Sequence, residues 1–151
     1  MKSKSIFLLA MMLFMTKSFG QNTVNEIDTE SGVHYITTNI NYPVAGTYLF
    51  EGGEPIVELN DNGTGFYQLH DQPKRPINWG IECEKTGETL FKKGFNSEAY
   101  SFWYKFLTTY EADSNLAWNL VPFTIHLNTL KMYIQGERVK SYKESEIKSE
   151  E

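Results

Sequence analysis

The sequence predicts an all-β protein that folds as an antiparallel up-and-down β-barrel of about eight strands. Aromatic residues make up 15% of the chain and β-branched residues are common, and both types are enriched in strands. Turn sequences recur at short intervals. No segment of helical length carries apolar residues at the spacing of an amphipathic helix. The connections look short and local, which favours the barrel over the alternative, a β-sandwich.

The first strands are short runs separated by turn residues. His34–Asn41 alternates loosely, and Gly46–Glu51 and Ile56–Asn60 are apolar runs. The turn Asn62-Gly63 then leads into Gly65–His70. Asn-Gly between two such runs is a strong hairpin signal, because both residues accept a positive φ. We therefore expect a hairpin at this point.

The later runs are mostly longer and are again bounded by turn residues: Ile77–Glu84, Thr89–Phe95, Ala99–Tyr110, Ala117–Asn128, Lys131–Gln135 and Arg138–Tyr142. Ala99–Tyr110 carries aromatic residues on both alternating faces, and these residue types form helices poorly, so we predict a strand. Pro122 removes a backbone donor, so its strand should lie at an edge or bend there. The predicted barrel domain covers residues 33–142.

Residues 1–20 have the layout of a secretory signal peptide. Lys2 and Lys4 precede an apolar run from Ile6 to Met15, and small residues occupy Ser18 and Gly20. The run is about half the length that crosses a bilayer, so no membrane span is expected. We predict cleavage near Gly20 and a secreted or periplasmic protein. Residues 21–32 are predicted to be a flexible leader, and residues 143–151 a disordered tail.

The charge of the chain excludes one class of partner. It holds 14 Lys and Arg against 19 Asp and Glu. Cleavage would remove Lys2, Lys4 and Lys17, leaving 11 against 19 and a net charge of −8. Such an acidic protein suits neither nucleic acid nor an anionic membrane surface. Cys83 is the one cysteine, so no intramolecular disulfide can form, and we expect it to be buried.

One stretch of the sequence resembles a known family. Gly46-Thr47-Tyr48 opens the first strong strand, and the turn from Asp61 to Gly65 follows soon after. This resembles the Gly-x-Trp opening of lipocalins and of small bacterial lipocalin-like domains, with Tyr48 where the family usually has Trp. The resemblance covers about residues 43–142. It implies an antiparallel barrel with an internal cavity for an apolar ligand.

Aromatic side chains are the best candidates for a binding site, because there are more of them than one face of a small core needs. Inside a barrel they would line an apolar pocket, and outside they would form a patch for a partner protein or a glycan. A barrel of about eight strands can also be filled by its own side chains. The predicted ligand-binding residues are Tyr48, Trp79, Trp103, Tyr104, Trp118 and Phe123.

No residue pattern predicts catalysis, a metal or a cofactor. His70, Cys83 and His126 are conceivable zinc ligands across a barrel, but their spacing does not support a site. Glu82 and Glu84 share one strand face, most simply a solvated one. We therefore expect an exported, lipocalin-like binding protein for a small apolar or amphipathic ligand. The alternative is a non-enzymatic interaction or inhibitor module of the cell envelope, and a hydrolase using Glu82, Glu84 or His70 ranks third.

Overall fold

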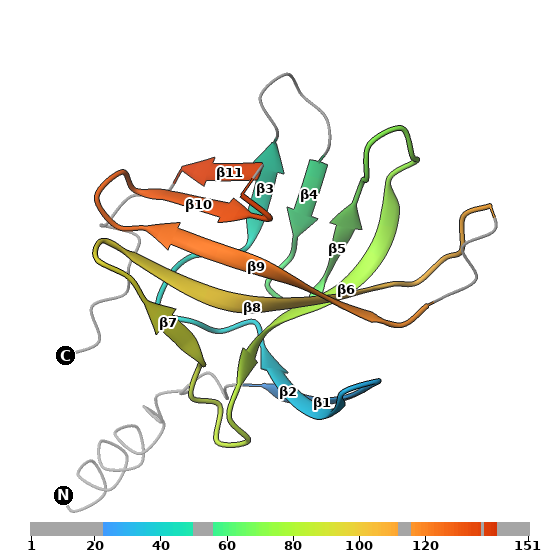
Figure 1. Cartoon of the computed structure of the whole chain (residues 1–151). Helices are drawn as coiled ribbons and strands as arrows, with labels where there is room; N and C mark the ends of the chain where they lie inside the picture. The colour runs from blue at the N-terminus through green and yellow to red at the C-terminus, as the bar shows by residue number, and fades with distance from the viewer. Residues whose placement is uncertain (1–22, 50–55, 112–115, 137, 142–151) are drawn as a thin grey trace, which may run out of the picture.

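The computed structural model describes residues 23–49, 56–111, 116–136 and 138–141 (Figure 1). These residues form an all-β protein without helices, as predicted. All pairings between its strands are antiparallel. The strands are β1 (Val24–Thr29), β2 (Gly32–Thr37), β3 (Gly46–Leu49), β4 (Ile56–Leu59), β5 (Thr64–Tyr67), β6 (Arg75–Cys83), β7 (Phe91–Lys93), β8 (Ser97–Phe106), β9 (Trp118–His126), β10 (Lys131–Ile134) and β11 (Arg138–Ser141).

Eight of these strands form a nearly closed barrel. The circuit runs β3-β4-β5-β6-β8-β9-β10-β11, and β11 returns to β3 through the pairing of Val139 with Leu49. The pairing of β6 with β8 completes the circuit on the opposite side. Strands that are neighbours in the barrel follow one another in sequence, apart from the intervening β7. The predicted up-and-down barrel of about eight strands is therefore confirmed.

The remaining three strands extend the barrel at one end. The β1–β2 hairpin pairs through β2 with the last residues of β6, and β7 pairs with the first half of β8. The strand that holds Pro122, β9, is not an edge strand, because it pairs with both β8 and β10. Pro122 pairs with Ser101 of β8 and follows directly on the last β9–β10 pair, Phe123 with Ile134, so its missing N–H interrupts none of the described β9–β10 pairs. The Asn62-Gly63 turn joins β4 to β5, as predicted.

The prediction of a flexible leader over residues 21–32 is wrong. Strand β1 occupies half of this segment, and β2 begins at Gly32, so the folded domain starts before residue 33. Ile27 is the one fully buried residue of β1, which leaves no alternating apolar pattern to recognise in the sequence. The predicted signal peptide and the predicted tail at residues 143–151 lie outside the described residues.

The lumen of the barrel is filled by aromatic and branched side chains. The ring of Trp79 stacks on Phe102 at a centroid distance of 5.8 Å, and Tyr67 stacks on Tyr104 at 4.5 Å. Alternate residues of β6, β8 and β9 point into this cluster, as the pleat of a strand requires. Offset and edge-on ring pairs of this kind pack an interior densely.

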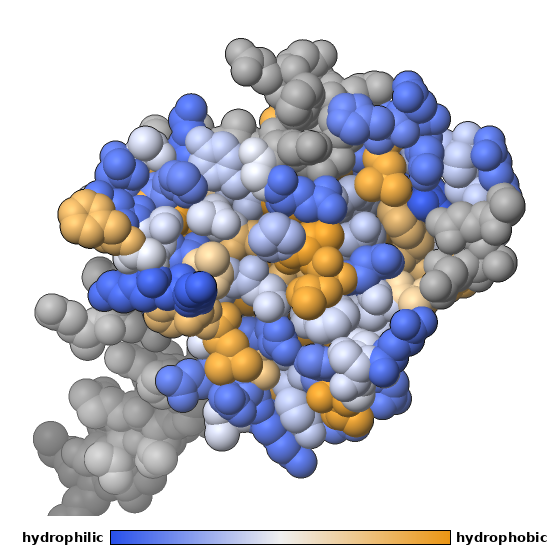
Figure 2. All heavy atoms as spheres, viewed as in Figure 1, coloured by the Kyte–Doolittle hydropathy of each residue, from blue (hydrophilic) through white to orange (hydrophobic). Residues whose placement is uncertain are grey.

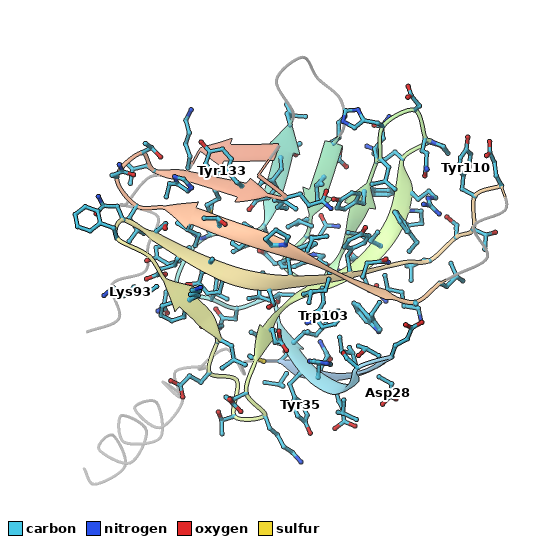
Figure 3. All side chains as sticks on the ribbon, viewed as in Figure 1. Asp28, Tyr35, Lys93, Trp103, Tyr110 and Tyr133 are labelled. Atoms are coloured by element: carbon cyan, nitrogen blue, oxygen red, sulfur yellow. The ribbon has the colours of Figure 1, made fainter. Side chains whose placement is uncertain are left out.

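A second, smaller cluster lies outside the barrel, beneath the β1–β2 hairpin. Ile27 and Ile36 of the hairpin pack on Trp103 of β8, and Trp118 of β9 lies at the margin. Figure 3 shows Trp103 at the junction between the barrel and the hairpin. Gly80 of β6 allows this close approach, because a Cβ there would lie 2.8 Å from the Cβ of Ile36. The hairpin is therefore a packed cover on the outer wall of the barrel.

Candidate binding site

A hollow of about 270 Å³ lies where the β1–β2 hairpin meets the barrel wall. We call it the hairpin hollow. It opens to solvent and brings together segments that are far apart in sequence. Four of its lining residues are polar and the others are apolar: Asn25, Glu26, Asn62 and Asn78, with Ile27, Ile36, Gly63, Trp79 and Trp118.

Trp79 holds the turn that forms one side of the hollow. Its indole Nε1 donates to the carbonyl oxygens of Asn60 (3.1 Å) and Thr64 (2.9 Å). Its backbone N–H donates to the carbonyl oxygen of Gly63 at 2.8 Å. Gly63 has a φ of +80°, which a residue with a side chain rarely adopts, so glycine is required at this corner. These bonds fix the position of the adjacent Asn62.

The opposite side of the hollow is set by strand register. Asn78 of β6 pairs with Lys105 of β8, and Lys105 pairs with Trp118 of β9. Directly paired residues project to the same face of a sheet. Asn78 and Trp118 therefore share the outer face of the barrel although 39 positions of sequence separate them. Both side chains are half-buried.

The polar side chains of the hollow are available to a ligand. Within the described residues, the side chains of Asn25, Glu26 and Asn78 have no hydrogen-bonding partner. Asn62 differs, because its Oδ1 accepts bonds from the backbone N–H and the hydroxyl of Thr64. Glu26 is the one charged residue among the described lining residues, but it pairs with Tyr35 on the face of the hairpin opposite to Asn25 and Ile36, so its carboxylate projects away from the barrel wall. The hollow thus offers uncommitted donors and acceptors beside an indole ring.

The six predicted ligand-binding residues divide among three places. Tyr48, Trp79, Tyr104 and Phe123 belong to the lumen cluster, Trp103 lies beneath the hairpin, and Trp118 lines the hairpin hollow together with Trp79. The hydroxyl of Tyr48 donates to the carbonyl oxygen of Val44 at 2.6 Å, so its polar end is satisfied inside the protein. Trp79 and Trp118 were predicted from the sequence for a lumen pocket or an aromatic patch, and none of the asparagines that line this hollow was predicted.

No protein-family model, curated protein or solved structure matches this chain. The nearly closed antiparallel barrel is compatible with a lipocalin-like architecture. No helix in the described part of the chain has the length and apolar character to cross a membrane. The assignment of a site therefore rests on the geometry of this molecule.

A second hollow, of about 360 Å³, lies on the outer wall formed by β8 and β9. Tyr100, Ser101, Leu120, Val121 and Pro122 line it. Figure 2 shows apolar atoms over these two strands near the middle of the viewed face. The side chain of Leu120 is 52% exposed. This wall is more apolar than the hairpin hollow and lacks a charged lining residue in the described part of the chain.

Ser31, His34 and Glu82 form a hydrogen-bonded chain at the tip of the hairpin. Nδ1 of His34 lies 2.7 Å from Oε1 of Glu82, and Nε2 lies 2.9 Å from the Ser31 hydroxyl. A carboxylate only accepts, so Nδ1 donates to Glu82, and in the neutral imidazole Nε2 accepts from Ser31. The connectivity is that of a serine–histidine–acid triad. The sequence did not predict this contact between His34 and Glu82.

The surroundings of Ser31 lack the other parts of an acyl-transfer site. Such a site needs N–H donors for the developing oxyanion. The Ser31 backbone N–H instead donates to the Thr29 hydroxyl at 3.1 Å, and Ser31 lines neither hollow. We interpret these hydrogen bonds as structural contacts that hold the hairpin against β6.

Cys83 and the histidines do not form a metal site. Burial raises the pKa of the Cys83 thiol, and the neighbouring Glu82 and Glu84 carboxylates raise it further. A raised pKa keeps the thiol protonated and poorly nucleophilic. Among the described residues, no three His, Cys, Asp or Glu side chains are grouped to hold a metal ion.

Proposed function

We propose that this chain is an exported, non-enzymatic binding protein that holds a small ligand in the hairpin hollow. One observation carries the proposal. The amide side chains of Asn25 and Asn78, which are unpaired within the described residues, lie with Trp118 around a hollow that opens to solvent. Binding sites commonly combine an aromatic wall with a few convergent polar groups.

The proposal differs from what the resemblance to lipocalins implies. A lipocalin-like carrier would hold an apolar ligand inside the barrel. Here Tyr48, Tyr67 and Phe123 of the lumen have no exposed surface, and Trp79 stacks on Phe102. A ligand inside the barrel would have to displace these side chains. The outer wall offers space without such a rearrangement.

A second candidate function is a protein-interaction module, as in the alternative predicted from the sequence. The exposed Leu120 and the adjacent Pro122 on the β8–β9 wall favour it. Exposed apolar residues in one place are typical of protein contacts. This site shares the outer wall of the barrel with the hairpin hollow but shares no described lining residue with it, so the two candidates can be separated by mutation.

The test is a nuclear magnetic resonance titration of the isotope-labelled protein with four probes. The probes are a neutral trisaccharide, choline, inorganic phosphate and laurate. We expect one of the first three to shift the Trp118 indole signal and the Asn78 side-chain signal. Laurate that shifts the signals of Trp79 and Tyr104 instead would identify a lumen carrier. If no probe shifts the Trp118 and Asn78 signals, the proposal is wrong and the Leu120 surface becomes the leading candidate.

A further inference from the structure

We propose that the ligand of the hairpin hollow is a carbohydrate. This inference rests on the proposed function and names the chemical class of its ligand. It follows from two properties of the hollow: an aromatic ring in its wall and uncommitted amide groups.

Trp118 supplies the surface on which a sugar ring can pack. A pyranose ring has an apolar face of C–H groups and a rim of hydroxyl groups. The indole of Trp118 is half-buried, so one part of it is anchored by the hairpin cluster while another part is accessible in the hollow. Large rigid aromatic rings give contact area at low cost in side-chain entropy.

The amide groups of the asparagines can form hydrogen bonds with the hydroxyl groups around the same sugar ring. Each asparagine amide carries two N–H donors and a carbonyl acceptor, and each sugar hydroxyl is both donor and acceptor. Asn25 and Asn78 come from β1 and β6, on two sides of the hollow, and each is unpaired within the described residues. The two amides can engage several hydroxyl groups at once. Unused polar groups favour a ligand that pairs them, because an apolar ligand would leave them desolvated and unpaired.

The size of the hollow narrows the class further. A volume of about 270 Å³ is at the lower limit for enclosed small-molecule sites. Because the hollow opens to solvent, it suits a short part of a glycan whose remainder extends outward.

The experiment follows the indole signals of the three tryptophans during titration with maltotriose, cellotriose, laminaritriose and triacetylchitotriose. We expect at least one trisaccharide to shift the Trp118 signal and to leave the buried Trp103 signal in place. Trp118→Ala and Asn78→Ala should each weaken that binding about tenfold or more, since about 1.4 kcal/mol corresponds to tenfold. Leu120→Ala, on the same outer wall but outside the hollow, is the matched control and should leave affinity unchanged.

The outcomes separate this inference from the proposed function. If choline or phosphate shifts the Trp118 signal and no trisaccharide does, the hollow binds a ligand and the carbohydrate assignment is wrong. If a trisaccharide binds with equal affinity to Asn78→Ala and to the correctly folded Trp118→Ala variant, the sugar site lies elsewhere and the inference fails. If no probe of any class shifts the signals of the hollow, the proposed function fails with it.

Discussion

The His34 imidazole lies 2.7 Å from the Glu82 carboxylate, across 48 positions of sequence, and joins the β1–β2 hairpin to the barrel. The two side chains are largely buried, with 24% and 19% of their surfaces exposed. The imidazole ring also contacts Trp103 at a centroid distance of 4.9 Å. One polar contact and one ring contact thus hold the hairpin where it forms a wall of the hairpin hollow.

Removal of either partner should destabilise the protein. We expect His34→Ala to lower the free energy of unfolding by about 1–3 kcal/mol, because it leaves the Glu82 carboxylate partly buried without its donor. Urea denaturation measures the change. Glu84→Gln, an exposed carboxylate just beyond the end of the same strand, is the control and should be within about 0.5 kcal/mol of the parent. The double variant His34→Ala/Glu82→Gln should cost less than the sum of the single changes, and strict additivity would contradict a direct interaction.

The contrast between the β4–β5 turn and β1 shows what could be predicted from sequence. Gly63 has a positive φ, which few residues other than glycine adopt, so the Asn62-Gly63 pair between two strand-like runs was enough to predict the hairpin. Strand β1 buries Ile27 and little else, so it has no periodic pattern, and its stability comes from pairing with β2. Local sequence therefore predicted the barrel strands and missed the strand that covers its outer wall.

The candidate site shows the same limit. Trp118 was predicted as a binding residue because the chain has more aromatic residues than one face of a small core needs. Asn78 was not predicted, because its place in the same hollow depends on the registers of β6 with β8 and of β8 with β9. An asparagine in a strand gives no local signal of function. Only the register of the folded sheet places it on the same face as Trp118, with Lys105 of β8 between them.

Gly80 is predicted to be required for docking of the hairpin. In Gly80→Ala the new Cβ would lie 2.8 Å from both Cβ and Cδ1 of Ile36, so the hairpin must move away from β6. We expect a loss of about 1–3 kcal/mol in stability and a red shift of tryptophan emission as Trp103 becomes exposed. Ser101→Ala, on the same outer wall, is the control. Unchanged emission and stability in Gly80→Ala would show that the hairpin is not held against β6 as described.

Cys83 is predicted to be unreactive in the folded protein. Its side chain is 3% exposed, and burial with two flanking glutamates raises the pKa of the thiol. Because the thiolate is the reactive form, we expect a disulfide reagent such as Ellman's reagent to react at least about tenfold more slowly than in urea. A Thr47→Cys/Cys83→Ala variant carries its thiol at an exposed position of β3 and should react at the rate of the unfolded chain. Rapid reaction of the native parent would contradict burial of Cys83.

Tyr48 is predicted to make the barrel sensitive to alkali. Burial raises the pKa of its phenol far above the usual value, while in the unfolded chain the phenol ionises near pH 10. Below that pH both states hold the proton and the stability is complete. As pH rises from about 10 toward the folded pKa, the unfolded state loses its proton first. The free energy of unfolding should then fall by about 1.4 kcal/mol per pH unit for this one group.

Urea denaturation at several pH values between 8 and 11.5 measures this slope, and absorbance of tyrosinate follows ionisation directly. In Tyr48→Phe, the fall in the free energy of unfolding per pH unit should be smaller by the contribution of one phenol. The substitution should also cost about 0.5–1.5 kcal/mol at neutral pH, because the hydrogen bond to the Val44 carbonyl is lost.

Phe123→Leu is the control: its ring lies 6.3 Å from that of Tyr48, and its loss weakens the packing without removing a phenol. It should lower stability at every pH and keep the parent's slope. If the free energy of unfolding of Tyr48→Phe falls with pH as steeply as that of the parent protein, other tyrosines, including the buried Tyr100, account for the alkaline sensitivity.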